Sequence, residues 1–598
     1  MYFRQTMKKV HALLFAFLMM TMSLAGCLSG DAGEDGSEGP AGADGKDGVD
    51  GQDGVDGQDG ADGLDGANGQ DGADGSSSPE TMLTSLSSPN ISMGCTEGGR
   101  IISNGLDNGD GEGTAQNGIL EEGEIDYRTT YCSKYELSYV HEINNMNMWS
   151  VHTRIPHLIG DTIYFVGSDN FNGSELWGYD TVTGSVWLVG EIDIGYNSWN
   201  TGPHILAVDK DIIYMMGSDG NNGWELWMYN TYTRSISMVE DINIGSGNSY
   251  PGSSGMEMIV GDRFYFAADD GVSGRELWVY DRNDDEAWMV EDIRVGTGDS
   301  SPGYSFSHLI NDKIYFSAND GNTGFELWVH DTSNNITSQL TDINPGSNSS
   351  FSSDCMNSIV VDNQIYFCAN NGTSDELWVH DTSNYTTWQL TNICESGCNS
   401  RAGEYMMELV GDSIYFSAVK NQTFIDLWLG LEDSEIWAHN ISNSTTWQVT
   451  DIYTGAENEG SRAGQYLSLV IGDTIYFNAG DGLTGSELWA HDTSNHSTWQ
   501  VADINSGPYG SILSNTAGYG KISVNNGRIY FGADDGITGT EIWVHDTTNH
   551  STWQVVDLNG QNSGLASDYI FIMDGDNIYF RTSRAFYVLK IKHTITYD

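Results

Sequence analysis

Short apolar segments with a period of two residues recur from residue 136 to the end of the chain. The clearest copy has three in succession, at residues 467–479, 487–492 and 498–504. Within residues 473–479, large apolar residues alternate with small or polar ones, as in a β-strand with one buried face. The pattern predicts a series of short strands joined by tight turns.

These segments form one repeated unit. An Ile-Tyr-Phe strand, or a close variant, occurs nine times, and a Glu-Leu/Ile-Trp strand follows in most copies at intervals that are mostly 50 to 54 residues. The nine tyrosines are Tyr164, Tyr214, Tyr265, Tyr315, Tyr366, Tyr415, Tyr476, Tyr530 and Tyr579. One unit of this length cannot bury its own apolar face, so neighbouring units must stack.

Each unit is predicted to contain four strands. The ninth copy stops after its third strand, at residues 585–591, and a matching fourth strand occurs at residues 136–143. Pairing of that first strand with the last three would remove the open sheet edge that a solenoid keeps. The sequence therefore predicts an all-β fold, a single closed β-propeller of nine four-stranded blades over residues 135–598.

The repeat resembles the one named for its consensus Glu-Leu-Trp-x-x-Asp-Gly-Thr, found in secreted proteins of marine bacteria and archaea. The resemblance covers residues 136–592 and is carried by Glu-Leu-Trp and by a following Asp, at Asp180, Asp281, Asp331, Asp381, Asp492 and Asp546. In this chain Thr usually replaces the consensus Gly, which affects the turn type. The resemblance implies a propeller and no settled activity.

Residues 1–27 have the features of a secretory signal. Three basic residues precede an apolar run from Ala12 to Met22 that is too short to cross a bilayer, and Leu-Ala-Gly-Cys27 follows. This ending resembles the lipobox of prokaryotic lipoproteins, which predicts lipidation of Cys27 and anchoring to the membrane at the cell surface. An ordinary signal that is cleaved nearby is the alternative.

Residues 28–89 form a predicted stalk and linker. Glycine occupies every third position from Gly30 to Gly75, as a triple helix requires, and most triplets end in Asp. Pro40 is the only proline of this repeat and Lys46 its only basic residue. A homotrimeric collagen-like stalk and an extended, self-repelling spacer both remain open.

Residues 90–134 form a small predicted unit bounded by Cys95 and Cys132. Its acidic segments resemble the two halves of an EF-hand calcium loop, with Asp107, Asn108, Asp110 and Glu124 as candidate metal ligands. Leu106 replaces the first ligand, and about six extra residues separate the halves. Calcium is therefore one interpretation, and an acidic, turn-rich loop is the other.

Six cysteines remain after Cys27. Proximity in the sequence predicts the pairs Cys95 with Cys132, Cys355 with Cys368, and Cys394 with Cys398. An even number in an exported chain is typical of disulfides. The cysteine count therefore supports the prediction of export.

The charge of the chain excludes nucleic acid as a partner. Lys and Arg total 24 against 84 Asp and Glu, which gives a formal net charge of -60. Such a field repels phosphates and attracts cations. Solubility in salty surroundings and binding of multivalent cations are the two interpretations.

Repeated polar turns supply the candidate ligand residues. Asp-Gly-x-x-Gly-x-Glu stands between the second and third strands, and its aspartates Asp270, Asp320, Asp481 and Asp535 are the predicted ligand-binding residues. Asp and Gly also simply build tight turns, which is the structural alternative. A His recurs within the third strand where earlier copies have Tyr, which indicates packing or hydrogen bonding between blades rather than catalysis.

The turns between the third and fourth strands carry possible glycosylation acceptors. Five Asn-x-Ser/Thr sites, interpreted as one repeated position, are Asn335, Asn384, Asn443, Asn495 and Asn549. In a four-stranded meander these turns share a face with those after the first strands. We therefore expect a ligand on the opposite face, beside the Asp-Gly turns and the blade connections.

The sequence thus predicts a lipid-anchored cell-surface propeller that binds an extracellular glycan or protein and has no catalytic site. A structural component of the cell envelope and a polysaccharide-degrading enzyme are the alternatives. Calcium is the one cofactor that the pattern suggests.

Overall fold

The computed structural model divides into two compact units, Met1–Ser78 and Pro79–Asp598. It describes residues 81–87, 89, 93, 95, 98–142, 156–168, 174–192, 203–351, 356–393, 399–420, 433–453, 460–512, 522–558, 571–581 and 585–597. These residues all belong to the second unit. The predicted signal, Cys27 and nearly all of the predicted stalk lie outside the described residues.

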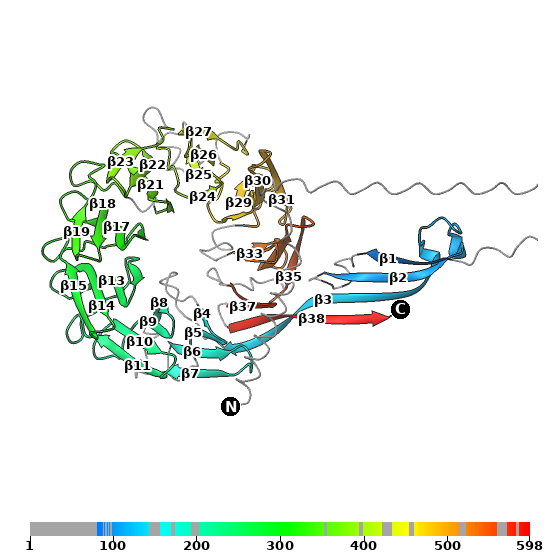
Figure 1. Ribbon diagram of the computed structural model, residues 1–598, viewed down its shortest axis with the longest axis horizontal. Coiled ribbons are helices and arrows are strands. Elements are labelled where there is room, and N and C mark those ends of the chain that lie inside the picture. Colours follow the sequence, from blue (N-terminus) through cyan, green and yellow to red (C-terminus); the bar gives the residue numbers. More distant parts are fainter. Residues whose placement is uncertain are drawn as a thin grey trace, which may run out of the picture. The chain divides into compact units, whose positions relative to one another are not determined.

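Four-stranded antiparallel sheets, here called blades, follow one another around a ring (Figure 1). Blades 1 to 3 contain β4 (His157–Ile159), β5 (Thr162–Ser168), β6 (Ser174–Asp180) and β7 (Val186–Gly190); β8 (His204–Asp209), β9 (Ile212–Gly217), β10 (Glu225–Asn230) and β11 (Ser235–Glu240); and β12 (Glu257–Val260), β13 (Arg263–Asp269), β14 (Arg275–Asp281) and β15 (Glu286–Glu291). Blades 4 and 5 contain β16 (Ser307–Ile310), β17 (Lys313–Asn319), β18 (Phe325–Asp331) and β19 (Ile336–Gln339); and β20 (Ser358–Val361), β21 (Gln364–Asn370), β22 (Asp375–Asp381) and β23 (Thr386–Gln389). Blades 6 to 8 contain β24 (Met407–Val410), β25 (Ser413–Val419), β26 (Ser434–Asn440) and β27 (Thr445–Gln448); β28 (Ser468–Ile471), β29 (Thr474–Gly480), β30 (Ser486–Asp492) and β31 (Ser497–Ala502); and β32 (Ser523–Asn525), β33 (Arg528–Asp534), β34 (Thr540–Asp546) and β35 (Ser551–Val556).

Blade 9 combines the two ends of the second unit. Its strands β36 (Phe571–Asp574), β37 (Asn577–Arg581) and β38 (Ala585–Tyr597) come from the end of the chain, and β3 (Ile125–Glu142) supplies the fourth. The pairing of β3 with β38 includes Glu136 opposite Lys590 and Leu137 opposite Leu589. The predicted contribution of the segment that starts at Glu136 to the last blade is therefore present as far as Glu142, where the described part of the segment ends. Over the described part of the chain, the all-β fold of nine four-stranded blades is confirmed.

Aromatic residues of the second strands form the core between blades. Tyr214 of blade 2 stacks on Phe264 of blade 3 with ring centroids 4.6 Å apart, and both side chains are almost fully buried. Phe165 in the second strand of blade 1 stacks on Phe586 in β38, the third strand of blade 9, with ring centroids 4.8 Å apart. Each such burial contributes roughly 1.5 to 3 kcal/mol. The Ile-Tyr-Phe repeat thus supplies the apolar contacts that one blade cannot make alone.

The sheet of blade 9 continues beyond the ring as a four-stranded ribbon (Figure 1). Strands β1 (Thr81–Ser87) and β2 (Gly99–Asp107) join the outer parts of β3 and β38, and two short 3-10 turns, η2 (Asp110–Glu112) and η3 (Glu122–Glu124), lie between β2 and β3. Hydrogen bonding between β3 and β38 runs without a break across residues 134 and 135. The predicted boundary between the small unit and the propeller therefore falls inside one continuous strand.

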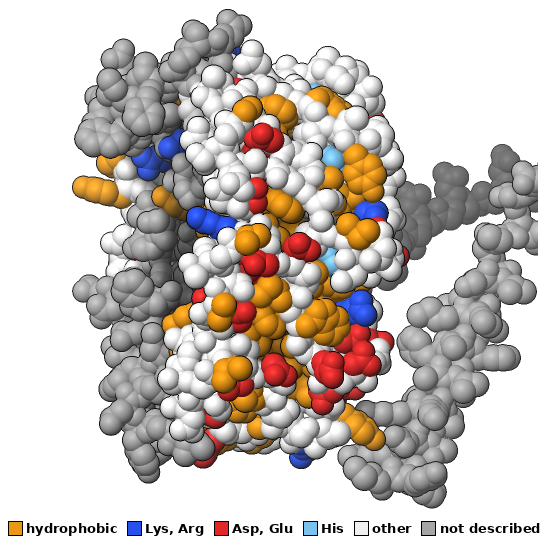
Figure 2. Space-filling view, turned by 90° about the vertical axis from the view of Figure 1, so that its left-hand side faces the viewer, with side chains coloured by type: hydrophobic (Ala, Val, Ile, Leu, Met, Phe, Trp, Pro, Cys, Tyr) orange, Lys and Arg blue, Asp and Glu red, His pale blue; other side chains and the backbone are white. Residues whose placement is uncertain are grey.

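The side of the ring that faces the viewer in Figure 2 is mixed in character. Figure 2 shows Asp and Glu side chains scattered among hydrophobic ones, with few Lys or Arg. In the part of the chain that the structure describes, no helix has the length and apolar character needed to cross a membrane.

Candidate functional site

Hydrogen bonds divide the polar turns between two faces of the ring. On one face, the turn after the third strand contacts the turn after the first: the Arg282 amide donates to the Asp262 carbonyl, and the Thr332 amide donates to the Asp312 carbonyl. We call this the glycosylation-motif face. On the other face, the turn after the second strand contacts the connection to the next blade: the Trp224 amide donates a hydrogen bond to Asn248 Oδ1. We call this the connection face.

The predicted ligand-binding aspartates lie in separate blades on the connection face. Asp320 Oδ1 accepts hydrogen bonds from the Asn322 and Thr323 amides, both at 2.8 Å. Partial burial opposes ionisation, but these hydrogen bonds hold the pKa of Asp320 below its ordinary value. The same pair of amide contacts is made by Asp270, Asp481 and Asp535. Each carboxylate therefore stabilises its own turn, and the structure does not bring the four together.

The Glu of Glu-Leu-Trp has a structural role that the sequence reading did not assign. Glu276 is fully buried and accepts hydrogen bonds from the Ile293 amide at 2.8 Å, the Ser300 amide at 3.2 Å and Ser300 Oγ at 2.6 Å. Burial raises the pKa of Glu276 to about 7, although these hydrogen bonds act in the opposite direction. Equivalent contacts to the connection are made by Glu225, Glu326 and Glu487. This carboxyl group fastens the blade connection to the third strand.

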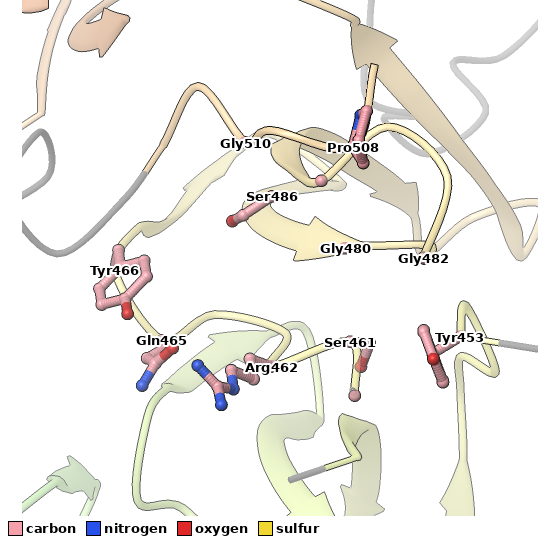
Figure 3. A pocket seen from close by; sticks show the side chains of 12 residues that line it. Tyr453, Ser461, Arg462, Gln465, Tyr466, Gly480, Gly482, Ser486, Pro508 and Gly510 are labelled. Atoms are coloured by element: carbon pink, nitrogen blue, oxygen red, sulfur yellow. The ribbon is translucent and has the colours of Figure 1, made fainter. Parts of the chain in front are cut away.

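A pocket of about 280 Å³ opens among the connections of blades 6, 7 and 8 (Figure 3). Most of its polar and aromatic side chains, including Tyr453, Arg462, Gln465 and Tyr466, come from the connection before blade 7, and Ser486 of β30 adds a hydroxyl group. Glycines from the Asp-Gly turn of blade 7, Gly480, Gly482 and Gly485, form part of its wall. Asp481 is the only predicted ligand residue whose two sequence neighbours both line this pocket. Pro508 and Gly510 of the connection from blade 7 to blade 8 complete the wall, so the pocket lies beside the blade connections where the sequence predicted a ligand.

Two further pockets occupy equivalent places between blades on the glycosylation-motif face. The pocket between blades 7 and 8 measures about 470 Å³ and is lined by Asp492, Asn495 and Trp499, among others. Its counterpart between blades 3 and 4 measures about 300 Å³. In the smaller pocket Arg263 forms an ion pair with Asp281 at 2.9 Å, whereas Thr474 takes the place of that arginine in the larger one.

The glycosylation motifs do not all share one position, which corrects the sequence interpretation. Asn335 has a positive φ of 60°, as do the residues that follow the other acceptors: Tyr385, Ser444, His496 and His550. Asn335 therefore lies one residue later in its turn than Asn384, Asn443, Asn495 and Asn549. All five side chains are exposed. The side-chain oxygens of Asn384 and its three equivalents accept a hydrogen bond from the amide two residues on, which is ordinary turn chemistry.

The repeated histidines pack between blades, in agreement with the expectation. His330 is fully buried; its Nδ1 lies 3.0 Å from Thr337 Oγ1, and its ring lies 5.4 Å from the Tyr265 ring of the preceding blade. Burial lowers the pKa of His330 to about 4. A neutral, enclosed imidazole of this kind stabilises the blade contact.

The predicted calcium ligands of the small unit hold its loop together through backbone contacts. Asp107 and Glu124 are both buried, at 2% exposure. Asp107 accepts hydrogen bonds from the Asn117 and Gly118 amides, and Glu124 accepts them from the Gly109 and Glu121 amides. Asn108 and Asp110 are joined by a hydrogen bond between their side chains at 2.7 Å. Over the described residues, no group of three or more His, Cys, Asp and Glu side chains is arranged to hold a metal ion.

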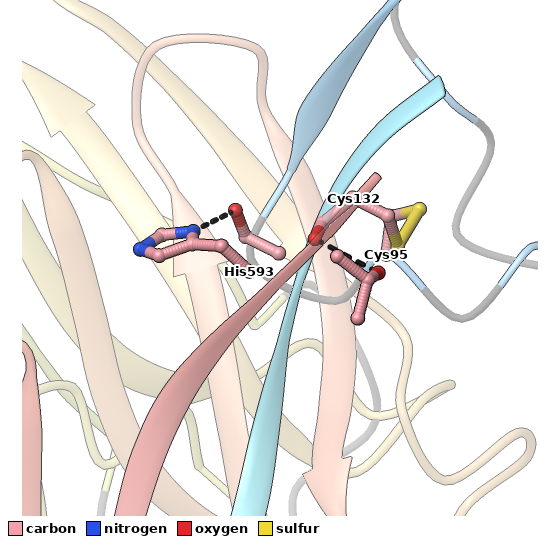
Figure 4. The surroundings of a disulfide bond; sticks show 5 residues. Cys95, Cys132 and His593 are labelled. Atoms are coloured by element: carbon pink, nitrogen blue, oxygen red, sulfur yellow. Dashed lines mark hydrogen bonds between the residues drawn. A yellow bond between two sulfur atoms is a disulfide. The ribbon is translucent and has the colours of Figure 1, made fainter. Parts of the chain in front are cut away.

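A disulfide attaches the start of the small unit to the ribbon. Cys95 is bonded to Cys132 of β3, as predicted. Figure 4 shows this bond beside β38, where His593 Nδ1 lies 2.7 Å from Ser133 Oγ. Cys368 is also disulfide-bonded. Its predicted partner Cys355 lies outside the described residues, as do Cys394 and Cys398.

The fold and these turns define a β-propeller. Residues 27–81 match the collagen triple helix repeat in 20 copies, which supports the predicted collagen-like stalk. No curated protein matches the chain. The resemblance to the Glu-Leu-Trp repeat family remains an expectation from the sequence.

Several solved structures share low similarity with the chain. A prolyl endopeptidase has 11% identity and a TM-score of 0.35, with 66% of this chain and 55% of that one covered. BamB from Moraxella catarrhalis has 11% identity and a TM-score of 0.32, with 76% and 99% covered. Dipeptidyl peptidase 4 from Porphyromonas gingivalis has 9% identity and a TM-score of 0.37, with 67% and 57% covered. The chain spans little more than half the length of the two peptidases, and the propeller assignment rests on its own blades.

Proposed function

We propose that this protein is a cell-surface binding protein, anchored by a lipid on Cys27 and held away from the membrane by its Gly-x-y stalk. The propeller would bind an extracellular glycan on its connection face. The observation that carries the proposal is the pocket lined by Tyr453, Arg462, Gln465 and Tyr466. A concave site with aromatic side chains and a few polar groups is what binding of a small polar ligand requires.

The composition of the pocket favours a sugar that bears a carboxylate. Tyrosine rings offer flat surfaces against which the C–H groups of a sugar pack, and glutamine and serine supply donors and acceptors for its hydroxyl groups. Arg462 is one of only 24 basic residues in a chain of net charge -60. A guanidinium group placed in a pocket binds a carboxylate with two parallel hydrogen bonds, which selects for acidic glycans.

A glycan array probed with the full-length protein in detergent tests this proposal. We expect binding to acidic glycans, weakened at least tenfold by Arg462→Ala or Tyr466→Ala. Asn495→Gln, which changes the pocket on the glycosylation-motif face, serves as the control and should bind as well as the unaltered protein. If only Asn495→Gln weakened binding, the ligand would lie on the glycosylation-motif face, and the proposed site on the connection face would be wrong.

The aspartates are tested as a matched pair. Asp481→Asn and Asp270→Asn change the same turn position in blades 7 and 3, and only the former adjoins the pocket. We expect Asp481→Asn to weaken glycan binding and Asp270→Asn to leave it unchanged. Equal weakening by both would contradict a single site and would instead support weak cation sites around the ring.

The same array separates the alternative functions. Degradation of a bound glycan during incubation would support a polysaccharide-degrading enzyme. Absence of any glycan or protein ligand, together with high abundance in isolated cell envelopes, would support a structural component.

Calcium in the small unit is proposed and tested separately. Calorimetric titration of the full-length protein with calcium should give one binding event that Glu124→Gln abolishes. An unchanged titration in that variant would exclude the small unit as the site.

A further inference from the structure

One face of the ribbon is apolar and open. In the strand pairing, Leu86 lies opposite Ile102, Ile102 opposite Thr129, and Thr129 opposite Tyr597. Residues directly opposite each other in antiparallel strands share a face, as do residues two positions apart on one strand. Ile102, Leu106 and Tyr131 lie on this face and are partly buried. The more exposed large apolar residues on this face, which we call the ribbon face, are Met82, Leu86, Tyr127, Ile595 and Tyr597.

These five side chains are strongly exposed. Their relative exposures are 65%, 71%, 67%, 50% and 77%, in chain order. Since an aromatic side chain alone buries 150 to 250 Å² when it is covered, the group presents an apolar surface of roughly a few hundred Å². A contiguous patch of that size usually marks an interaction site.

The opposite face of the same strands is partly buried and partly charged. Ser103 and Thr130 are buried there, each at 4% exposure. Farther along the strands, that face carries exposed charges, including Lys134 and an ion pair between Lys592 and Glu136. Only the ribbon face is both apolar and uncovered.

The ribbon face also lacks the acidic residues that dominate the chain. Along β1, β2 and the outer parts of β3 and β38, its ionisable residues besides tyrosine are Arg100 and His593. The Arg100 guanidinium lies over the Tyr131 ring, 4.6 Å from its centroid, and His593 Nδ1 lies 2.7 Å from Ser133 Oγ. In a chain of net charge -60, this is a surface on which several copies can meet without bringing carboxylates together.

The collagen-like repeat ends where the ribbon begins. The repeat match covers residues 27–81, its last regularly spaced glycine is Gly75, and β1 starts at Thr81. The short segment between Gly75 and Thr81 spans at most about 20 Å. Three chains joined in a triple helix up to Gly75 would therefore present three ribbons at one place.

The stalk has little stability of its own as a trimer. Pro40 is the only proline of the repeat and Lys46 its only basic residue, so three chains would repel each other through their aspartates. A clamp at one end of the stalk would raise the effective concentration of the three chains and set their relative register.

We propose that the ribbon face is a three-chain interface, in which Tyr127, Tyr597 and Leu86 of three copies pack together and hold the collagen-like stalks in register. This proposal rests on the trimeric form of the stalk, which is itself a proposal. The ribbon thereby couples three propellers to one stalk, so that three ligand-binding sites face the same target.

The mass of the full-length protein in detergent, measured by sedimentation equilibrium, tests the interface. The unaltered protein should be a trimer at micromolar concentration. The double variant Tyr127→Ser with Tyr597→Ser should dissociate to monomers or require at least a tenfold higher concentration to associate. The matched control, Asp126→Ser with Thr596→Ala, changes the adjacent positions on the opposite face and should remain trimeric.

A second variant protects the test against misfolding. Tyr597 lies at the end of β38 and is 77% exposed, so Tyr597→Asp introduces a charge at the interface without disturbing the ring. It should dissociate the trimer while hydrogen exchange of the blades is unchanged. Persistence of the trimer in both variants would overturn the proposal.

The outcomes separate this inference from the trimeric stalk. The circular dichroism signature of the triple helix reports the stalk independently of the mass. If the ribbon variants dissociate the trimer and the unaltered protein shows no triple helix, the ribbon interface is supported and a trimeric stalk is excluded. A triple-helical trimer that the variants leave intact shows that the stalk alone associates, and a monomeric unaltered protein overturns both.

Discussion

The buried glutamate of blade 3 offers a direct test of how each blade connection is held. We predict that Glu276→Ala frees the connection that follows blade 3. The substitution removes the acceptor of the Ile293 amide, and it leaves the Ser300 amide and Ser300 Oγ with the Arg275 carbonyl as their acceptor. An unpaired buried donor costs about 1 to 3 kcal/mol, so the local opening free energy at Ile293 should fall by roughly 1 to 3 kcal/mol.

Hydrogen exchange measured by mass spectrometry reads this effect at the affected amides. Because about 1.4 kcal/mol corresponds to a factor of ten, exchange at Ile293 should accelerate about 10-fold to 100-fold, and exchange at Ser300 should accelerate less. The equivalent amides of blade 4, Ile343 and Ser350, serve as an internal reference and should change little. The matched control is Glu286→Ala, which removes an exposed glutamate from β15 of the same blade.

Equal exchange at Ile293 in the two variants would contradict this prediction. That result would mean that the backbone contacts of the connection, such as the Ser300 amide with the Arg275 carbonyl at 3.0 Å, hold it without the carboxyl group.

Three further predictions concern the whole chain. Burial raises the pKa of Glu225, Glu276 and Glu487 from 4.5 to about 7, so their stabilising contribution is complete below about pH 4.5 and is lost as the pH rises through 7. Urea unfolding should therefore show higher stability at pH 5 than at pH 8, and the opposite pH dependence would refute the prediction. Deletion of residues 136–143 should accelerate hydrogen exchange at Tyr587, more than 400 residues away, and unchanged exchange there would contradict closure of the ring by terminal strands. Cys27→Ser should release the protein into the medium, whereas continued retention in the membrane fraction would exclude the lipid anchor.

The blade architecture could be predicted from the sequence because its causes are local and repeated. Alternation in segments such as residues 473–479 is set by the period of a strand, and the short Asp-Gly turns allow only antiparallel neighbours. Counting the repeated strands was enough to predict that the last copy lacks its fourth strand and that the segment starting at residue 136 supplies it. Cys95 and Cys132 could be paired because no nearer partner was present.

The roles of single residues depended on the tertiary structure. The glutamate of Glu-Leu-Trp has the same neighbours in sequence whether it is exposed or buried, and only the folded blade places the connection amides around it. Asn335 is the exception, because it stands four residues after Asp331 whereas Asn384 stands three after Asp381, so alignment on the aspartates would have shown its offset. The pocket around Arg462 combines loops of three blades, so no single repeat contains it.

The sequence by itself determined the number of blades, the strand order within them and the collagen-like repeat that precedes them, since each follows from periodicity along the chain. Only the tertiary structure showed that the small unit and the last blade share one sheet. The register between β3 and β38, strands separated by more than 400 residues, places Tyr127 and Tyr597 on one exposed face. Such a face arises from long-range backbone pairing, which no local pattern of hydrophobic and polar residues encodes.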